Sequence, residues 1–260
     1  MESICSDLAN EHAALDEIVE AIDDEAWQTP TLSPGWAVRD QISHLWFFDG
    51  SAALAATDPD AFATHKATLL SSSGEPDTVF GRKASPPELL EAWRTGREQL
   101  VGVLRGLDPK SRVVWYGPTM GAVSFATARL METWAHGQDI VDALGAYRRP
   151  TRRLRHVAHI GVTARPFSYL INARALPDQQ PYVELEAPDG DTWTWGDPSS
   201  SDQIRGEALD FCLLVTQRRH IDDVTLDIRG AGAAEWMSIA QAFAGPPGGG
   251  RPSSTGRRSV

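Results

Sequence analysis

The stretch Phe125-Ala-Thr-Ala-Arg-Leu-Met-Glu-Thr-Trp-Ala-His-Gly-Gln-Asp-Ile-Val-Asp142 decides how the first half of the chain folds. Small, apolar and ionisable residues recur in and just after it at three- and four-residue steps, which predicts one helix with a single inward face: Phe125, Ala128, Glu132, Ala135, His136, Asp139 and Ala143. Glu132 and His136 stand one turn apart on that face, close enough to bind one cation. An inward ionisable pair costs free energy unless a charged group, such as a divalent metal, satisfies it. Ordinary helices also carry Glu-x-x-x-His as a solvated or hydrogen-bonded pair, so the stretch alone leaves both interpretations open.

Length and composition bound the kind of protein. The 260 residues suit one large domain or two small ones, and the net charge of −11 argues against a nucleic-acid partner. The two cysteines, Cys5 and Cys212, lie far apart in the chain, which argues against a disulfide framework and fits a reducing compartment. No apolar run approaches the ~18 residues of a membrane span, and the start lacks a basic signal sequence. We therefore expect a cytoplasmic protein with no membrane partner, acting on a small molecule as a monomer or homodimer.

Three more amphipathic helices are predicted before the helix over residues 125–142. The first is predicted over residues 3–22, and the second follows the Pro34-Gly35 turn. The third opens at Ser85-Pro-Pro-Glu88, which combines an N-cap serine, first-turn prolines and a capping-box glutamate. Residues 57–85 read as a long connection with one short helix around 61–70. Four long helices in the first 147 residues predict a four-helix bundle.

A bundle builds metal sites from side chains on facing helices. His44 lies in the aromatic-rich second helix, where a lone histidine is more often a satisfied core residue than a ligand. Together with Glu132 and His136, however, it would supply three ligands and leave one open position, as in catalytic zinc sites.

These residues carry a resemblance to a known family. The segment Ser33-Pro-Gly-Trp36 leading to Asp40-x-x-x-His44, followed by Glu132-Thr-Trp-Ala-His136-Gly-x-Asp139, resembles the DinB-like superfamily. Within it, the match is to the branch of mycothiol-dependent maleylpyruvate isomerases and related actinobacterial metal-binding proteins. The resemblance implies that His44, Glu132 and His136 are the three metal ligands, normally for zinc (Zn2+), although another divalent metal fits the same residues. It also implies a small cytosolic thiol, mycothiol or a similar compound, as cosubstrate.

The second half of the chain changes character after Arg148-Arg-Pro-Thr151, which predicts a domain boundary between residues 147 and 148. The expected elements are a helix from Leu154, a hairpin of strands 182–187 and 192–195 around Asp189-Gly190, a helix over 206–219, a strand over 224–229 and a helix over 236–243. They predict a smaller α+β domain over 148–245 with an antiparallel sheet, which resembles a sterol-carrier-like domain. The whole chain is thus a mixed fold, a bundle followed by an α+β domain. Residues 246–260 are rich in Gly, Pro and Ser and are expected to be a disordered tail.

Two further residues are candidates for catalysis. Asp139, near His136, is predicted to orient its imidazole, although a helix-surface aspartate is the alternative. An arginine of the second domain would bind a substrate carboxylate, with Arg229 taken as the candidate. The other arginines considered are Arg205, Arg218 and Arg219, and the tryptophans considered for lining the site are Trp36, Trp46 and Trp134. His156 and His159 form a second pair on one face, either a metal pair or plain hydrogen-bonded packing.

Several reactions fit a zinc ion with an open position. A bound thiolate can add to an activated double bond and leave again, giving isomerisation, or it can displace a leaving group, giving S-transfer. A bound hydroxide would instead give hydrolysis or hydration without a thiol, and Lewis acidity alone would promote a rearrangement. A bundle that binds a metal or ligand without catalysis is the alternative outside enzymes. The ligand set does not choose among these, nor does it name the substrate.

Overall fold

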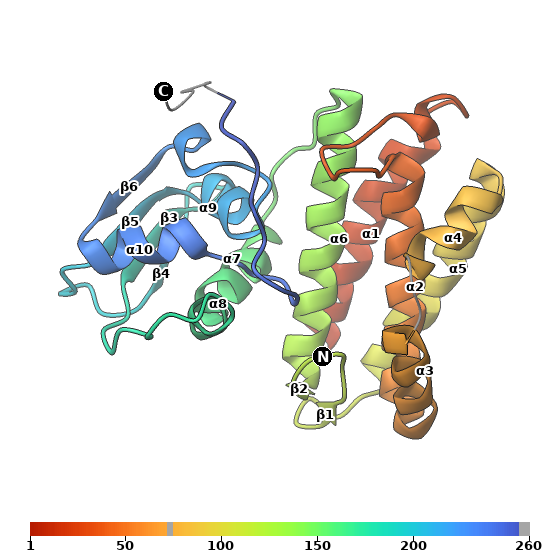
Figure 1. The fold of residues 1–260 in the computed structure, drawn as a ribbon, viewed down its shortest axis with the longest axis horizontal. Helices are drawn as coiled ribbons and strands as arrows, with labels where there is room; N and C mark the ends of the chain where they lie inside the picture. The colour runs from red at the N-terminus through yellow and green to blue at the C-terminus, as the bar shows by residue number, and fades with distance from the viewer. Residues whose placement is uncertain (72–74, 255–260) are drawn as a thin grey trace. The chain divides into compact units, whose positions relative to one another are not determined.

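The computed structural model describes residues 1–71 and 75–254. The chain forms two compact units, Met1–Arg148 and Arg149–Val260, which Figure 1 shows in red to green and in green to blue. The division of the chain into independently folding domains, at residues 147/148 and again at 245/246, stays a prediction. None of the helices in the described residues is long and apolar enough to span a membrane.

The first unit is built on four long helices: α1 (Glu2–Glu20), α2 (Val38–Thr57), α5 (Pro86–Arg105) and α6 (Ala122–Leu144). Each of α1 and α2 packs against both α5 and α6, so the helices close into a bundle (Figure 1). The predicted four-helix bundle is confirmed. The short strands β1 (Arg112–Val113) and β2 (Met120–Gly121) form a hairpin that leads into α6.

Local sequence signals set the ends of these helices. At the start of α5, the backbone N–H and the hydroxyl of Ser85 donate to Glu88 Oε2 at 2.8 and 2.7 Å, which is the predicted capping box. At the end of α6, Gly145 adopts a left-handed conformation with φ of +61°. A glycine takes this conformation without the steric cost of a Cβ, so α6 stops there.

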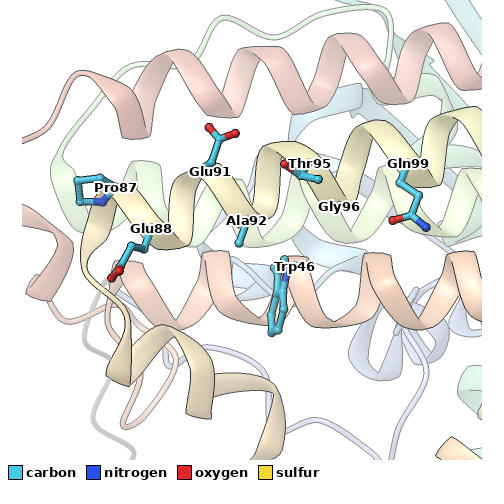
Figure 2. Close-up of a pocket in the computed structure, with 8 residues that line it drawn as sticks. All are labelled: Trp46, Pro87, Glu88, Glu91, Ala92, Thr95, Gly96 and Gln99. Atoms are coloured by element: carbon cyan, nitrogen blue, oxygen red, sulfur yellow. The ribbon is translucent and has the colours of Figure 1, made fainter.

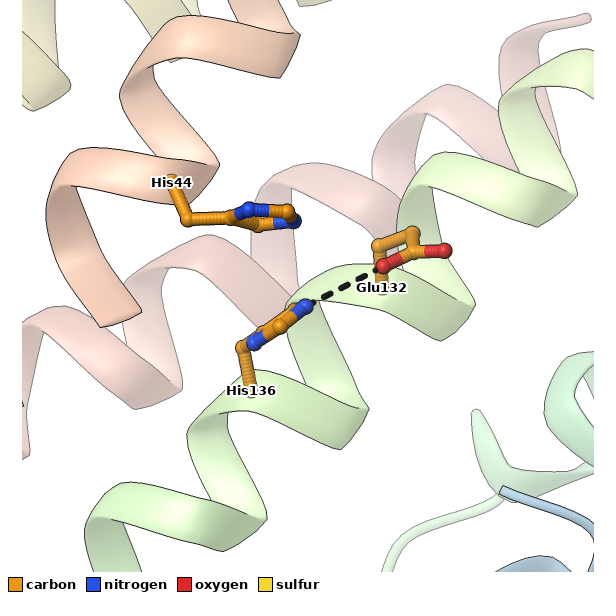
Figure 3. A group of neighbouring side chains, drawn as sticks. All are labelled: His44, Glu132 and His136. Carbon is orange, nitrogen blue, oxygen red and sulfur yellow. Dashed lines mark ion pairs between the residues drawn. The ribbon is translucent and has the colours of Figure 1, made fainter. Parts of the chain in front are cut away.

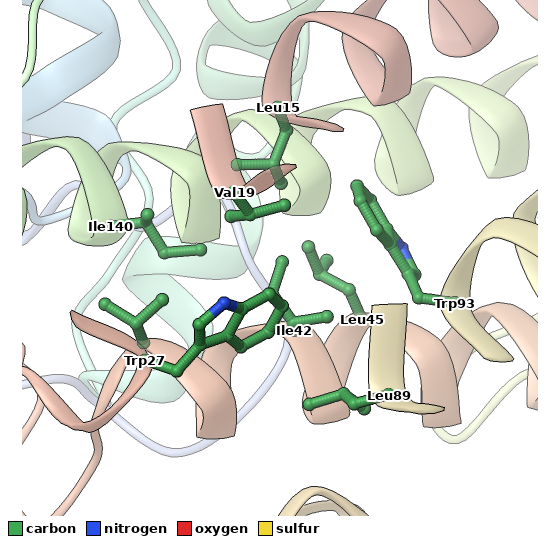
Figure 4. Packing of buried hydrophobic residues seen from close by; sticks show 9 residues of the cluster. Leu15, Val19, Trp27, Ile42, Leu45, Leu89, Trp93 and Ile140 are labelled. Atoms are coloured by element: carbon green, nitrogen blue, oxygen red, sulfur yellow. The ribbon is translucent and has the colours of Figure 1, made fainter. Parts of the chain in front are cut away.

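The bundle core is an apolar cluster to which all four long helices contribute (Figure 4). Its fully or nearly fully buried members are Leu15, Val19, Trp27, Val38, Ile42, Leu45, Leu89, Trp93 and Ile140. Burying one such aliphatic or aromatic side chain contributes roughly 1.5–3 kcal/mol. The cluster therefore fixes how α2 and α6, which carry the candidate ligands, lie against each other.

The connection between α2 and α5 contains two helices, α3 (Pro59–Ser71) and α4 (Pro76–Lys83). The short helix predicted around residues 61–70 is confirmed. The prediction of a loop over residues 76–83 is wrong, because these residues form α4. The α4 helix packs on α2 through Ser43, whose hydroxyl donates to Asp77 O at 2.6 Å and accepts from Gly81 N at 3.0 Å. A Cβ on Gly81 would lie 2.5 Å from Ser43 Cβ, so only a glycine permits this approach. The eight residues of α4 include few apolar positions, so no hydrophobic period announces the helix in the sequence.

The second unit combines helices with one four-stranded sheet (Figure 1). Its elements are α7 (Leu154–Thr163), α8 (Arg165–Ile171), β3 (Tyr182–Glu186), β4 (Thr192–Trp195), β5 (Gln203–Glu207), α9 (Ala208–Val215), β6 (Leu226–Arg229) and α10 (Ala231–Ile239). The strand order is β4-β3-β5-β6, and the predicted β3–β4 hairpin is antiparallel as expected. The α+β class of this unit is confirmed.

The sheet contains the predicted antiparallel pairing, and one parallel pair makes it mixed. Strand β5, which the sequence did not reveal, pairs parallel to β3 with Val183 opposite Ile204, and antiparallel to β6. Ile204 is the single fully buried side chain of β5, and Gly206 pairs with Leu185 and Leu226 at a φ of +152°. With so little alternation, the sequence does not predict this strand, and the helix predicted over 206–219 spans Ala208–Val215.

The predicted tail, residues 246–260, lies partly outside the described residues, which end at Ser254. Within the described part, Gly248 N donates to Gln241 Oε1 at 2.8 Å and Ser254 N donates to Asp223 Oδ2 at 2.8 Å. Residues 246–254 are thus attached to the second unit by hydrogen bonds, whereas disorder over 255–260 stays a prediction.

Candidate metal centre

Three side chains that the sequence singled out meet inside the bundle (Figure 3). His44 comes from α2 and Glu132 and His136 from α6, and their ligand atoms all lie within 4.8 Å of one another. His136 Nε2 is 3.2 Å from Glu132 Oε2, and the rings of His44 and His136 are 4.3 Å apart. The convergence on which the expected metal site depends is therefore present. That these residues bind a metal stays a prediction.

A chain of hydrogen bonds fixes the orientation of His136. The Thr31 hydroxyl donates to Trp36 O at 3.0 Å, so its oxygen accepts from Gln41 Nε2, also at 3.0 Å. The carbonyl oxygen of Gln41 then faces His136 Nδ1 at 2.6 Å. Because an amide oxygen can only accept, Nδ1 of His136 carries a proton, and Nε2, which faces Glu132, is the atom that a cation could bind in exchange for a proton. Gln41 and His136 are buried, so water competes little for this bond.

His44 is oriented in the same way by a residue that the sequence did not suggest. Its Nδ1 lies 2.7 Å from Asp77 Oδ2 of α4, in a pair whose side chains are 17% and 14% exposed. Burial by itself would raise the pKa of Asp77, but the hydrogen bond from His44 and its charge lower the pKa overall. Asp77 is therefore an ionised acceptor that holds a proton on Nδ1 of His44, so Nε2 is the atom that a cation could bind in exchange for a proton.

Glu132 is the anionic member of the group. Burial favours its neutral form, but the hydrogen bond and charge of His136 and the charges of Arg129 and His44 outweigh this and lower its pKa to about 2. Arg129 lies one turn before Glu132 on α6 and is itself buried in an ion pair with Asp49, with 2.8 Å between Nη2 and Oδ1. Glu132 is consequently a carboxylate at any physiological pH.

The group offers donors that a divalent metal prefers: one carboxylate oxygen and two imidazole nitrogens, which a metal would bind in the neutral form after displacing a proton. Both histidines give their other ring nitrogen to an acceptor, the arrangement usual for metal-binding histidines. With three protein donors, a four-coordinate ion would retain one position for a small ligand. The residues present thus fit a zinc ion or a similar cation.

Aromatic side chains form the wall beside the two histidines. Trp36 stacks on His136, with ring centroids 6.1 Å apart and planes at 22°, and lies 5.2 Å from His44. Phe48 is on the other side of His44 at 4.6 Å. The indole N–H of Trp36 donates to Glu75 Oε1 at 3.1 Å, so the segment that leads into α4 also holds this wall in place.

Trp46 and Trp134, which were expected to line the metal site together with Trp36, lie in other environments. Trp46 packs on Phe80 at 4.4 Å and lines an open groove along α5, which Figure 2 shows. The residues around that groove are Trp46, Pro87, Glu88, Glu91, Ala92, Thr95, Gly96 and Gln99. Trp134 is buried, with the guanidinium carbon of Arg148 5.1 Å from its ring centroid.

The two residues predicted to be catalytic are placed as follows. Asp139 is fully buried on α6 and accepts a hydrogen bond from Ser33 Oγ at 3.4 Å, while Nδ1 of His136, which it was expected to orient, faces Gln41. Arg229 lies on β6 of the second unit, where its exposed side chain pairs with Asp227 at 2.7 Å. Catalytic roles for Asp139 and Arg229 stay predictions.

The other candidates of the second unit have structural partners. Arg205 pairs with Glu184 at 2.7 Å, and His159 Nδ1 accepts from Trp195 Nε1 at 3.3 Å. The latter contact is the hydrogen-bonded packing that was the alternative to a second metal pair.

Comparison with known proteins identifies the family of the chain. The family model of the mycothiol maleylpyruvate isomerase N-terminal domain matches residues 8–141, which include all three candidate ligands. This chain belongs to that family. The resemblance read from the sequence motifs is thereby confirmed.

Two relatives match nearly the whole chain. Uncharacterised proteins from two strains of Mycobacterium tuberculosis are each 43% identical to this chain over 249 residues, covering 95% of this chain and 97% of theirs. Crystal structures of the mycothiol-dependent maleylpyruvate isomerase and of a point mutant of it have TM-scores of 0.58 and 0.57. They are 16% and 15% identical to this chain, with 87% of it and 92% of theirs covered, so they share its fold.

Proposed function

We propose that this family member is a metal-dependent enzyme that binds zinc, or another divalent cation, on His44, Glu132 and His136. It uses a small cytoplasmic thiol, mycothiol or a similar compound, for isomerisation of, or S-transfer to, an electrophilic small molecule. One observation carries the proposal: both histidines are bound at Nδ1 by buried or half-buried acceptors, and one ligand atom from each lies within 4.8 Å of the others and of an ionised glutamate. The name of the crystallised neighbour, a mycothiol-dependent isomerase, supports the choice of thiol and reaction.

The protein's own groups have separate tasks in this scheme. Glu132 and the two imidazoles supply one negative charge and three donor atoms, and Asp77 and Gln41 hold the rings in the binding orientation. A divalent metal, when bound, lowers the pKa of a coordinated thiol so that thiolate forms near neutral pH. Trp36 and Phe48 place apolar ring surface beside the histidines, which lowers the local polarity and strengthens electrostatic interactions at the centre.

The proposed function has a direct test. The purified chain is loaded with zinc, and consumption of mycothiol or isomerisation of maleylpyruvate, the compound in the neighbour's name, is measured with wild type and with His44→Ala. We expect thiol-dependent turnover in the wild type, and loss of both bound zinc and turnover in the variant.

Other outcomes favour the competing functions. Turnover of an electrophile in the absence of thiol would point to a metal-dependent hydrolase, lyase or rearrangement enzyme. Stoichiometric metal without turnover on a panel of electrophiles would point to a binding module. Absence of bound metal in the wild type would refute the proposal itself.

A further inference from the structure

A second polar cluster lies on the same face of α2 as the candidate metal centre. Ser51 of α2, His65 of α3 and Tyr116, which lies between β1 and β2, meet with their polar atoms in mutual contact. The Tyr116 hydroxyl is 2.9 Å from His65 Nε2 and 3.1 Å from Ser51 Oγ, and Ser51 Oγ is 3.2 Å from His65 Nε2.

The hydroxyl proton of Tyr116 has more than one possible acceptor. The single hydroxyl proton of Ser51 is donated to Phe47 O at 3.0 Å, so Ser51 Oγ accepts from the Tyr116 hydroxyl. His65 Nε2 lies 3.2 Å from Ser51 Oγ and is a second donor to it in the tautomer that carries the proton on Nε2. The Tyr116 proton can therefore turn away to another acceptor while Ser51 accepts from His65 instead, and no buried oxygen loses its partner.

The cluster is connected to the metal centre by one side chain. His44, Phe48 and Ser51 stand at successive turns of one face of α2, which places Ser51 about 10 Å along the helix from His44. The Phe48 ring lies 4.6 Å from His44 and 5.6 Å from Tyr116. On α6, the small residue Ala128 lies one turn from Glu132 and is half-buried. His44, Phe48, His65 and Tyr116 are also half-buried, so solvent reaches them.

We infer that Tyr116, supported by His65 and Ser51, donates a hydrogen bond to a carbonyl or carboxylate oxygen of the electrophile. The inference rests on the proposed function, because it places the reacting carbon of that electrophile at the metal centre. The electrophile of the proposed function must then carry this oxygen some distance from the carbon attacked. Burial raises the pKa of Tyr116, which keeps its hydroxyl protonated and able to donate at neutral pH.

The chemistry explains why a donor is needed there. The thiolate sulfur forms a bond to the alkene carbon, and the π pair of the C=C bond moves through the conjugated system onto the carbonyl oxygen. The former double bond rotates as a single bond; the pair then returns, the C–S bond breaks and the thiolate leaves. No proton is gained or lost overall. Between addition and departure of the thiolate, negative charge builds up on the carbonyl oxygen. A hydroxyl donor held beside that oxygen stabilises the charge.

The first test measures binding without turnover. Zinc-loaded protein is titrated calorimetrically with maleate, an unsaturated dicarboxylate, in the absence of thiol. Tyr116→Phe keeps the aromatic ring, and we expect it to weaken maleate binding about tenfold through loss of a hydrogen bond to a charged group. The matched control is Tyr147→Phe, since Tyr147 is 82% exposed, and it should bind within about twofold of wild type.

A second pair of variants separates donation from packing. His65→Gln keeps an N–H donor and should retain most of the affinity, whereas His65→Leu should lose about as much as Tyr116→Phe. Circular dichroism melting of each variant checks that the fold is unchanged. Absence of maleate binding by wild type, or equal affinity in wild type and Tyr116→Phe, overturns the inference.

The turnover assay then distinguishes this inference from the proposed function. If Tyr116→Phe weakens maleate binding but wild type catalyses no thiol-dependent reaction, the thiol chemistry fails and the oxygen-binding site stands. If wild type turns over and Tyr116→Phe changes neither maleate affinity nor kcat/KM, the oxygen-binding site fails and the thiol chemistry stands.

Discussion

Replacement of Asp77 tests whether a residue outside the candidate ligand set controls the metal centre. Its carboxylate is 2.7 Å from His44 Nδ1 in a mostly buried pair. A hydrogen bond between such charged partners contributes about 1.5–3 kcal/mol, and each 1.4 kcal/mol is about a factor of ten in affinity. Asp77→Ala should therefore weaken zinc binding by about 10- to 100-fold. Asp77→Asn keeps an acceptor oxygen without the charge and should lose less.

The assay is a competition titration of the purified chain with a chromophoric zinc chelator. Asp60→Ala, which removes an exposed carboxylate on the neighbouring helix α3, is the matched control and should bind zinc as wild type does. Thermal melting of the metal-free variants reports whether α4 is still attached. Equal zinc affinity in Asp77→Ala, Asp60→Ala and wild type, with α4 intact, would refute the assignment of Asp77 as the orienting residue.

Three other perturbations have defined outcomes. Glu132→Ala removes charge and one of three donors, so elemental analysis should find the bound metal lost, with affinity down by more than about 100-fold; stoichiometric metal in this variant would contradict the ligand set. Burial lowers the pKa of His12 from 6.5 to about 4, so the unfolded state takes up a proton first as the pH falls. Stability should therefore drop by up to about 3 kcal/mol between those two pH values in urea unfolding, and His12→Gln should lack this slope. Gly81→Ala would force its Cβ against Ser43 and should cost about 1–3 kcal/mol, whereas Gly50→Ala, with open space around it, should be neutral or stabilising.

Much of the bundle was predictable because helical order is local. The period of apolar residues placed all four long helices, and the capping box of Ser85 and Glu88 located the start of α5. Glu132 and His136 share a face of α6 for the same reason, since four residues make about one turn.

The partners of the histidines were harder to foresee, and for different reasons. Gln41 stands three residues before His44 on α2, so helical spacing was a usable signal that a polar group lies near the site. Asp77 gave no such signal, because it comes from a short, polar helix that the sequence did not reveal, and no periodicity relates it to His44.

By itself the sequence determined the long helices, the Glu132–His136 pair and the family to which the chain belongs. Tertiary structure alone decided that α4 brings Asp77 to His44, that Gln41 faces His136, and that β5 pairs parallel to β3. The physical reason is the range of the interactions. Helix spacing and caps follow from residues within a turn or two of one another, whereas these contacts join segments that meet only when the apolar faces have packed.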